Sequence, residues 1–255
     1  MAARAWPGMA AALLLALVVA ASGTSLRVPR GLWGRLWLAG LLNITAWMGL
    51  AALSLGWLSA SEGAIVAYTM PVWAALLAWP VLGERPTPGR MAALALSMAG
   101  VVLVIAGKGI DIGLAKLPGV ALALAGCSLF ALGTVMTKRW PLAMPAGASV
   151  AWQLGLGMLP LLVATLVFDR PDWGAVSTFG WVSMAYMAVL PLCLCYLAWF
   201  AALRRLPAGL ATQGTLLAPV VSVLGAAIFL GEPCGLREVA SLGLVLGGVL
   251  LAVRG

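Results

Sequence analysis

The chain has 255 residues, of which 64% are hydrophobic and 9% charged, and its mean hydropathy is +1.09. So few polar side chains do not cover the surface of a soluble globule of this length. The composition therefore excludes a soluble protein and predicts an all-α integral membrane protein. The formal net charge is +8, but the basic residues are spread over short segments. This spread argues against nucleic acid as a partner and favours anionic lipid headgroups as neighbours.

Nine segments are apolar enough to cross a membrane, which takes about 20 apolar residues per helix. Clusters of Arg, Lys, Asp, Pro and Gly separate them. The predicted helices are 6–21, 34–57, 60–83, 89–106, 118–137, 147–168, 180–203, 208–231 and 237–253.

The first of these segments also resembles a signal peptide, with Arg4 before the apolar stretch and a small-residue cleavage site near Ala21. Cleavage there would put Arg27, Arg30 and Arg35 outside the cell and reverse every later loop against its charge. We therefore interpret the segment as a membrane span.

The basic residues predict the orientation, because Lys and Arg are biased toward the cytoplasm. Ten of the fifteen lie on one side of the nine-span arrangement. They are Arg27, Arg30, Arg35, Arg85, Arg90, Lys138, Arg139, Arg204, Arg205 and Arg254. The other side has Arg4, Lys108, Lys116, Arg170 and Arg237. The C-terminus is therefore expected in the cytoplasm and the N-terminus outside, in a multi-pass protein of the cell inner (cytoplasmic) membrane.

Two stretches 148 residues apart share one pattern. Pro71 and Pro219 are each followed twelve positions later by Gly and thirteen later by Glu. Between 71–104 and 219–252, 13 of 34 positions are identical, and no gap is needed. Apolar composition alone would not align Pro, Gly-Glu and Gly-Val, so the pattern indicates an internal duplication. Helix 118–137 is left without a partner in the first half.

These residues resemble the EamA-type domains of the drug/metabolite transporter superfamily. The matching positions are Pro71, Gly83, Glu84, Gly100 and Val101, and in the second copy Pro219, Gly231, Glu232, Gly248 and Val249. The resemblance implies two EamA-like repeats. The first, 1–107, is incomplete with four helices; 108–117 is a linker loop, and 118–255 holds five helices. The first of the usual ten helices is absent, so we expect a start shortened by mis-assigned initiation or by gene erosion.

Repeats of five helices enter the membrane from opposite sides, which makes the duplication an inverted-topology repeat, the arrangement expected for alternating access. The resemblance implies a secondary transporter that moves a small organic metabolite, amino-acid-like or drug-like, outward. The alternative is a non-transporting eroded paralogue or an accessory membrane subunit. An enzyme has little support, because the chain has no His, no metal-ligand cluster, no Ser or Cys beside a base, and no Walker or Rossmann glycine pattern. We expect no catalytic residue, metal or cofactor.

Pro71 and Pro219 fall at the middle of their helices, where each removes a backbone donor and frees a carbonyl. The prolines are either packing kinks or hinges in a cavity wall. Polar and aromatic side chains within the spans are candidates for the substrate pathway, because such groups are costly unless they face a cavity or another helix. They are Asn43, Trp47, Tyr68, Thr69, Gln153, Tyr196, Gln213 and Thr215. Interhelical hydrogen bonding is the alternative role. As a pathway, this lining would suit a zwitterionic or neutral polar solute.

Ionisable residues are nearly absent from the predicted spans. Glu62 is a candidate proton site near the outer end of its helix, or else a solvated acid favoured by the helix N-terminus. Glu84 and Glu232 precede helices, where the same dipole argument makes them structural. Gly243 and Gly247 form a small-xxx-small motif that would suit helix packing or a homodimer.

Overall fold

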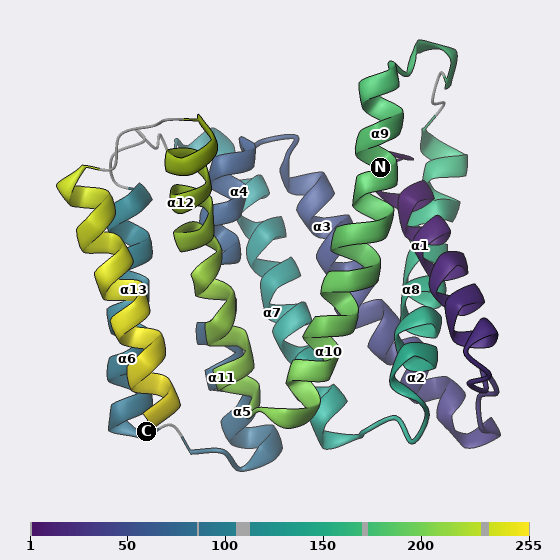
Figure 1. Ribbon diagram of the computed structural model, residues 1–255, viewed down its shortest axis with the longest axis horizontal. Coiled ribbons are helices and arrows are strands. Elements are labelled where there is room, and N and C mark those ends of the chain that lie inside the picture. The colour runs from purple at the N-terminus through teal and green to yellow at the C-terminus, as the bar shows by residue number, and fades with distance from the viewer. Residues whose placement is uncertain (1, 86, 106–112, 170–172, 231–234, 255) are drawn as a thin grey trace. The chain divides into compact units, whose positions relative to one another are not determined.

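The computed structural model describes residues 2–85, 87–105, 113–169, 173–230 and 235–254. Over these ranges the chain is almost entirely helical, with no strand, and it divides into two compact units (Figure 1). Unit 1 comprises Met1–Leu53 with Leu132–Arg205, and unit 2 comprises Ser54–Ala131 with Leu206–Gly255. Each unit therefore contains helices from both halves of the internal duplication.

Unit 1 is built from four long helical segments and the end of a fifth. They are α1 (Ala2–Ala21); α2 (Trp33–Gly40), η2 (Leu41–Ala46) and α3 (Trp47–Ser54); α8 (Ala146–Phe168); and α9 (Thr178–Met187), η5 (Ala188–Cys195) and α10 (Tyr196–Arg205). Short 3₁₀ turns, η1 (Arg30–Leu32) and η4 (Trp173–Ala175), precede α2 and α9. The helix α7 (Leu117–Arg139) begins in unit 2 and ends in unit 1.

Unit 2 holds the remaining segments. They are α4 (Ala60–Ala67), α5 (Met70–Leu82), α6 (Pro88–Ile105), η3 (Leu114–Lys116), most of α7, α11 (Ala208–Gln213), η6 (Gly214–Leu217), α12 (Ala218–Leu230) and α13 (Leu236–Arg254). Figure 1 shows α11 continuing into α12, and α6 lying beside α13. Ser241 of α13 donates a hydrogen bond of 2.7 Å to the carbonyl of Gly100 in α6, which joins these two helices.

Six helical segments are long and apolar enough to cross a membrane, and two shorter apolar helices, Pro88–Leu103 and Val239–Ala252, accompany them in the described part of the chain. Together with α11–α12 they correspond to the nine segments expected from the sequence. Their ends differ from the expected ones by no more than four residues. The all-α membrane fold is thus confirmed.

Two expected helices are not continuous. The first, 60–83, stops at Ala67 and restarts at Met70, while 208–231 passes through the 3₁₀ turn η6 before α12. Pro71 and Pro219 are the second residues of the restarted helices, where a missing N–H is tolerated. The starts, restarts and last residues of the two helices, 60/208, 70/218 and 82/230, are all 148 residues apart. The proline pattern therefore corresponds to a break repeated in both copies.

A second repeated irregularity was not expected from the sequence. The π-helical segment η2, Leu41–Ala46, becomes 189–194 when shifted by 148 residues, and this range lies inside the π-helical segment η5, Ala188–Cys195. Segments of π-helix are rare in proteins, and those that occur are frequently found at functional sites. The structural repeat therefore extends upstream of residue 71, into unit 1.

Candidate functional site

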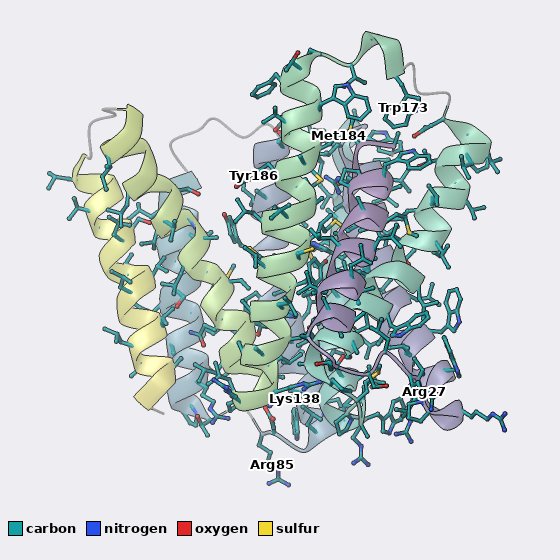
Figure 2. The ribbon with its side chains drawn as sticks, turned by 45° about the vertical axis from the view of Figure 1, so that its right-hand side comes forward. Arg27, Arg85, Lys138, Trp173, Met184 and Tyr186 are labelled. Atoms are coloured by element: carbon teal, nitrogen blue, oxygen red, sulfur yellow. The ribbon has the colours of Figure 1, made fainter. Side chains whose placement is uncertain are left out.

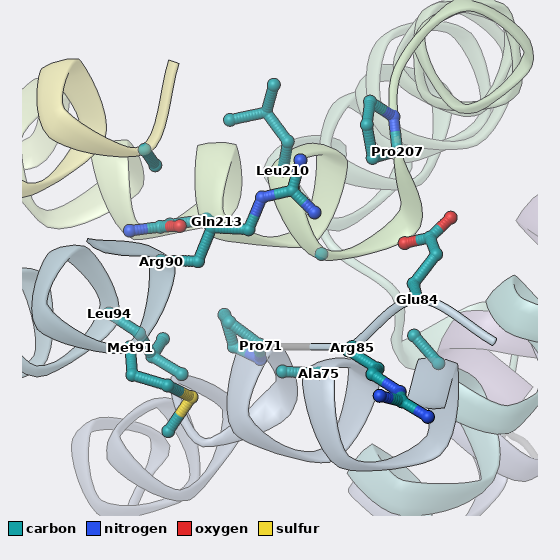
Figure 3. A pocket seen from close by; sticks show the side chains of 13 residues that line it. Pro71, Ala75, Glu84, Arg85, Arg90, Met91, Leu94, Pro207, Leu210 and Gln213 are labelled. Atoms are coloured by element: carbon teal, nitrogen blue, oxygen red, sulfur yellow. The ribbon is translucent and has the colours of Figure 1, made fainter. Parts of the chain in front are cut away.

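A narrow cleft in unit 2 gathers three of the sequence-predicted residues, Pro71, Glu84 and Gln213 (Figure 3). Its volume is about 50 Å³, enough for a few water molecules. An organic solute therefore requires its walls to separate. The lining residues are Pro71, Ala75, Ala78, Glu84, Arg85, Arg90, Met91, Leu94, Pro207, Gly209, Leu210, Gln213 and Ala252.

The uncharged polar wall of this cleft is Gln213, the last residue of α11. Its side chain is 5% exposed, and its Nε2 donates to the hydroxyl of Ser97 in α6 at 3.3 Å. This bond orients the amide between α11 and α6. Pro71 lines the same cleft from the start of α5, so the repeated helix break forms part of the wall (Figure 3).

The charged part of the cleft comes from the turn between α5 and α6. Gly83 ends α5 with a left-handed backbone, φ 72°, which glycine adopts without strain, and the chain turns there into Glu84 and Arg85. Arg90 lies in the first turn of α6, where its backbone N–H donates to Thr87 Oγ1 at 3.2 Å. Glu84 and the two arginines form no ion pair in the described part of the chain. In chemical terms, a guanidinium pairs with carboxylates and a glutamate with ammonium groups.

A second polar group lies in unit 1 and is buried. Asn43 and Gln153 are 0% and 1% exposed. Asn43 Nδ2 donates to Gln153 Oε1 at 3.1 Å and to Thr137 Oγ1 at 3.2 Å. Gln153 Nε2 donates to Ser149 Oγ at 3.1 Å, and the Tyr196 hydroxyl donates to the Asn43 carbonyl at 3.4 Å. These bonds join helices of both repeats inside unit 1.

The EamA-like transporter family model matches residues 1–106 and 117–254. The chain belongs to this family. A Bacillus subtilis protein called uncharacterized transporter YvbV is 30% identical over 243 residues, which cover 94% of this chain and 77% of that protein. A Salmonella typhimurium protein named "Probable amino-acid metabolite efflux pump" is 28% identical over 185 residues, 69% of this chain and 61% of that protein. One solved crystal structure shares the fold, with a TM-score of 0.86, 19% identity and coverage of 99% of this chain and 86% of its own.

The predicted pathway residues of this EamA-family chain are divided equally between the two units. Asn43, Trp47, Gln153 and Tyr196 belong to unit 1, whereas Tyr68, Thr69, Gln213 and Thr215 belong to unit 2. The hydroxyls of Thr69 and Thr215 donate within their own helical segments, to the carbonyls of Val66 at 2.7 Å and Thr212 at 2.6 Å. These two bonds satisfy carbonyls at the helix breaks. Gln213 alone among the eight lines the cleft.

Tyr68 packs on an apolar cluster of unit 2, where it is partly buried. The buried members of this cluster are Leu94, Val101, Leu216, Val220 and Val245. Among the repeat-motif residues, Glu84 lines the cleft, whereas Gly231 and Glu232 lie outside the described residues. A pathway role for the set remains a prediction.

Glu62 is held at the start of α4. Its Oε1 lies 2.6 Å from Lys116 Nζ, and its Oε2 accepts from the Ser59 backbone N–H at 2.9 Å. The Ser59 hydroxyl in turn accepts from the Glu62 N–H, which completes a capping box. These contacts favour the helix N-terminus interpretation, and a proton site at Glu62 remains a prediction.

Sequence reasoning did not anticipate Arg85, Arg90 and Ser97 as neighbours of Gln213. The arginines had been explained by membrane topology, and Ser97 has no polar neighbour in sequence that would mark it. A helical face plot aligning Arg90, Leu94 and Ser97 would have placed all three on one side of α6. It would not have shown that α11 lies opposite them.

Proposed function

We propose that this chain is a secondary transporter of the cytoplasmic membrane that exports a small amino-acid-like or drug-like metabolite. The observation that supports this most is the unit 2 cleft, where the Gln213 amide lies among Glu84, Arg85 and Arg90 beside a broken helix. A guanidinium binds a carboxylate, a carboxylate binds an ammonium, and an amide serves either group. A small zwitterion is the solute that satisfies all three.

The substrate class has independent support from a relative in the family. The Salmonella typhimurium protein is named as an amino-acid metabolite efflux pump, and an amino-acid-like solute carries the two charges that the cleft complements. Outward movement is proposed on the same ground. No catalytic step is part of this proposal.

The proposed orientation places the C-terminus in the cytoplasm and the N-terminus outside. Figure 2 shows Arg27, which follows α1, and Lys138, in the last turn of α7, toward one end of unit 1, and Trp173 toward the other. We assign the end with Arg27 and Lys138 to the cytoplasmic face, where anionic lipids attract basic residues. Partners are then the solute and membrane lipid; a homodimer through Gly243 and Gly247 remains a prediction.

Alternating access is the proposed mechanism, and the repeated helix breaks support it. A break before Pro71 and before Pro219 lets each half-helix tilt without distorting a continuous ladder of hydrogen bonds. Because the cleft holds about 50 Å³, tilting of α5 against α11 is the movement that would admit a solute.

The test is counterflow of labelled zwitterionic amino acids in proteoliposomes, with the wild-type chain, Arg90→Gln and Glu84→Gln. We expect saturable flux that is strongly reduced by either cleft substitution and unchanged by Arg139→Gln, which removes a basic residue of unit 1. No flux for zwitterionic, anionic, cationic or drug-like solutes, with folded protein, would reject the proposal and favour the non-transporting alternative.

A further inference from the structure

Unit 1 contains two helix contacts that are equivalent by the internal repeat. Thr45 of η2 donates to the Gly157 carbonyl in α8, and Cys193 of η5 donates to the Ala11 carbonyl in α1 at 3.3 Å. The two donors, Thr45 and Cys193, are 148 residues apart and equivalent in the repeat. The two acceptors, Gly157 and Ala11, are therefore equivalent positions of α8 and α1, at an offset of 146 residues. The contact of η2 with α8 is therefore repeated by η5 with α1.

The first of these contacts is closed. We call it the amide contact, after the 3.1 Å hydrogen bond between Asn43 and Gln153. Gly40 allows α2 to approach α8 so closely that a Cβ there would lie 3.1 Å from the Gln153 carbonyl. At the same contact Trp33 and Trp152 meet edge to face, with ring centroids 5.2 Å apart. Little space remains between these helices.

At the second contact, the positions equivalent to those of the amide contact carry residues that keep the two helices further apart. Asn43 becomes Pro191, Gln153 becomes Pro7, and Gly40 becomes Ala188. Two prolines offer no side-chain hydrogen bond, and the alanine adds the Cβ that Gly40 lacks. The second contact therefore lacks a hydrogen bond equivalent to that between Asn43 and Gln153, and its helices cannot approach as closely as α2 and α8 do.

The second contact is open. Trp6 and Trp181 are the counterparts of Trp152 and Trp33, but Trp173 contacts both of them, with centroids 5.8 Å from each ring. A cavity of about 500 Å³ remains, lined by Trp6, Trp173, Trp181, Met184 and neighbouring alanines of α1, α9 and η5. We call this cavity the tryptophan slot. Figure 2 shows Trp173 and Met184 at the end of unit 1 opposite Arg27.

The two contacts are mechanically joined. α1 packs on α8 along its length, since a Cβ on Gly8 would lie 2.5 Å from Met158 Sδ, and one on Gly147 would lie 2.7 Å from Val19 Cγ2. Packing this close resists sliding of one helix along the other. The amide contact involves α8 and the slot involves α1 at the opposite end, so a tilt of the pair as one body would separate one contact as it closed the other.

We propose that the amide contact and the tryptophan slot close alternately, with the Asn43–Gln153 bond holding the present state and Trp173 acting as the wedge that keeps the slot open. This inference rests on the proposed transport function and specifies which contacts change in its cycle. Asn43 suits a reversible contact, because its buried Oδ1 has no hydrogen-bond partner in the described part of the chain. That acceptor gains a partner, water, only when the contact opens.

The test measures slot closure directly. Ala10 lines the slot from α1 and Met184 lines it from α9, and we expect a pair of cysteines at these positions to form a disulfide only when the walls approach. The double variant Ala10→Cys with Met184→Cys is made with the four native cysteines replaced by serine. Its oxidation rate is followed as protection from a polyethylene-glycol maleimide.

We expect Asn43→Leu and Gln153→Leu to raise this oxidation rate several-fold. The matched control is Thr165→Val, which replaces another buried polar group of α8 that takes no part in the Asn43–Gln153 hydrogen bonds and does not line the slot, and it should leave the rate unchanged. Trp173→Ala removes the wedge without touching the buried amides and should also raise the rate. The proposal is overturned when folded Asn43→Leu and Trp173→Ala both oxidise at the rate of Thr165→Val.

Flux is recorded separately in the same proteoliposomes. A responsive oxidation rate without solute flux would reject the proposed transport function but retain the coupled contacts. Flux with an unresponsive rate would reject the coupled contacts alone.

Discussion

Gly100 of α6 lies so close to Val245 of α13 that a Cβ on the glycine would be 2.7 Å from Cγ2 of the valine. A glycine of α13 approaches α6 in the same way, because a Cβ on Gly248 would lie 2.2 Å from the hydroxyl of Ser97. Gly248 and Val245 are the counterparts of Gly100 and Ser97 at the offset of 148. The two last helices of the repeats thus pack around a local two-fold axis, each presenting its glycine to the other.

Replacing Gly100 by valine should destabilise unit 2. The added side chain meets the backbone of α13 as well as Val245, and overpacking of this kind costs about 1–3 kcal/mol. We expect a lower thermal unfolding midpoint in detergent. Gly243→Ala in α13 is the control, because nothing lies within 4 Å of its added Cβ. Equal midpoints for the two variants would contradict the packing described.

The ion pair of Glu62 and Lys116 provides a test of whether Glu62 carries protons or supports its helix. Glu62→Gln retains a side chain that completes a capping box but removes the charge. We expect Glu62→Gln and Lys116→Met to lower the unfolding midpoint by similar amounts, with Glu62→Ala lowering it further. Flux at saturating solute should persist in Glu62→Gln. Loss of flux in that variant, with its stability retained, would assign the proton role to Glu62.

The break before Pro71 should be needed for movement more than for folding. Pro71→Ala restores a backbone donor and favours a continuous helix through Tyr68 and Thr69. We therefore expect stability to be maintained while the rate of flux falls. Pro80→Ala is the matched control, because Pro80 lies in the same helix, has Ile228 as its counterpart and lies away from the break. A variant at Pro71 with normal flux would show that the break is only a packing feature.

Substitutions of Gln213 and Ser97 distinguish binding of the solute by the Gln213 amide from the orientation of that amide by Ser97. Gln213→Leu removes the amide from the cleft, and the loss of one hydrogen bond to the solute corresponds to about a tenfold rise in the apparent KM for flux. Ser97→Ala removes only the hydroxyl that orients the amide, so its effect should be smaller and in the same direction. If Ser97→Ala were as damaging as Gln213→Leu, the bond between α11 and α6 would matter more than the solute contact.

The amino-acid sequence by itself determined the membrane class, the all-α fold, the positions of nine helical segments and the duplication that relates them. Hydropathy is sufficient for the first three, because every backbone group in lipid needs an internal partner and helices of a fixed length supply it. The duplication follows from the aligned Pro, Gly and Glu residues. The prolines at 71 and 219 also indicated where two helices would be interrupted, since the missing donor is a local property of the chain.

Tertiary structure alone decided which helices form each compact unit and which polar groups meet. Asn43 and Gln153 are 110 residues apart yet share a buried hydrogen bond, while Arg90 and Gln213 come from different repeats and line one cleft. Nearly uniform apolar helices do not encode in their hydropathy which faces pack together. Close approaches at small residues such as Gly40 and Gly100 select those faces, and they depend on the shape of both partners.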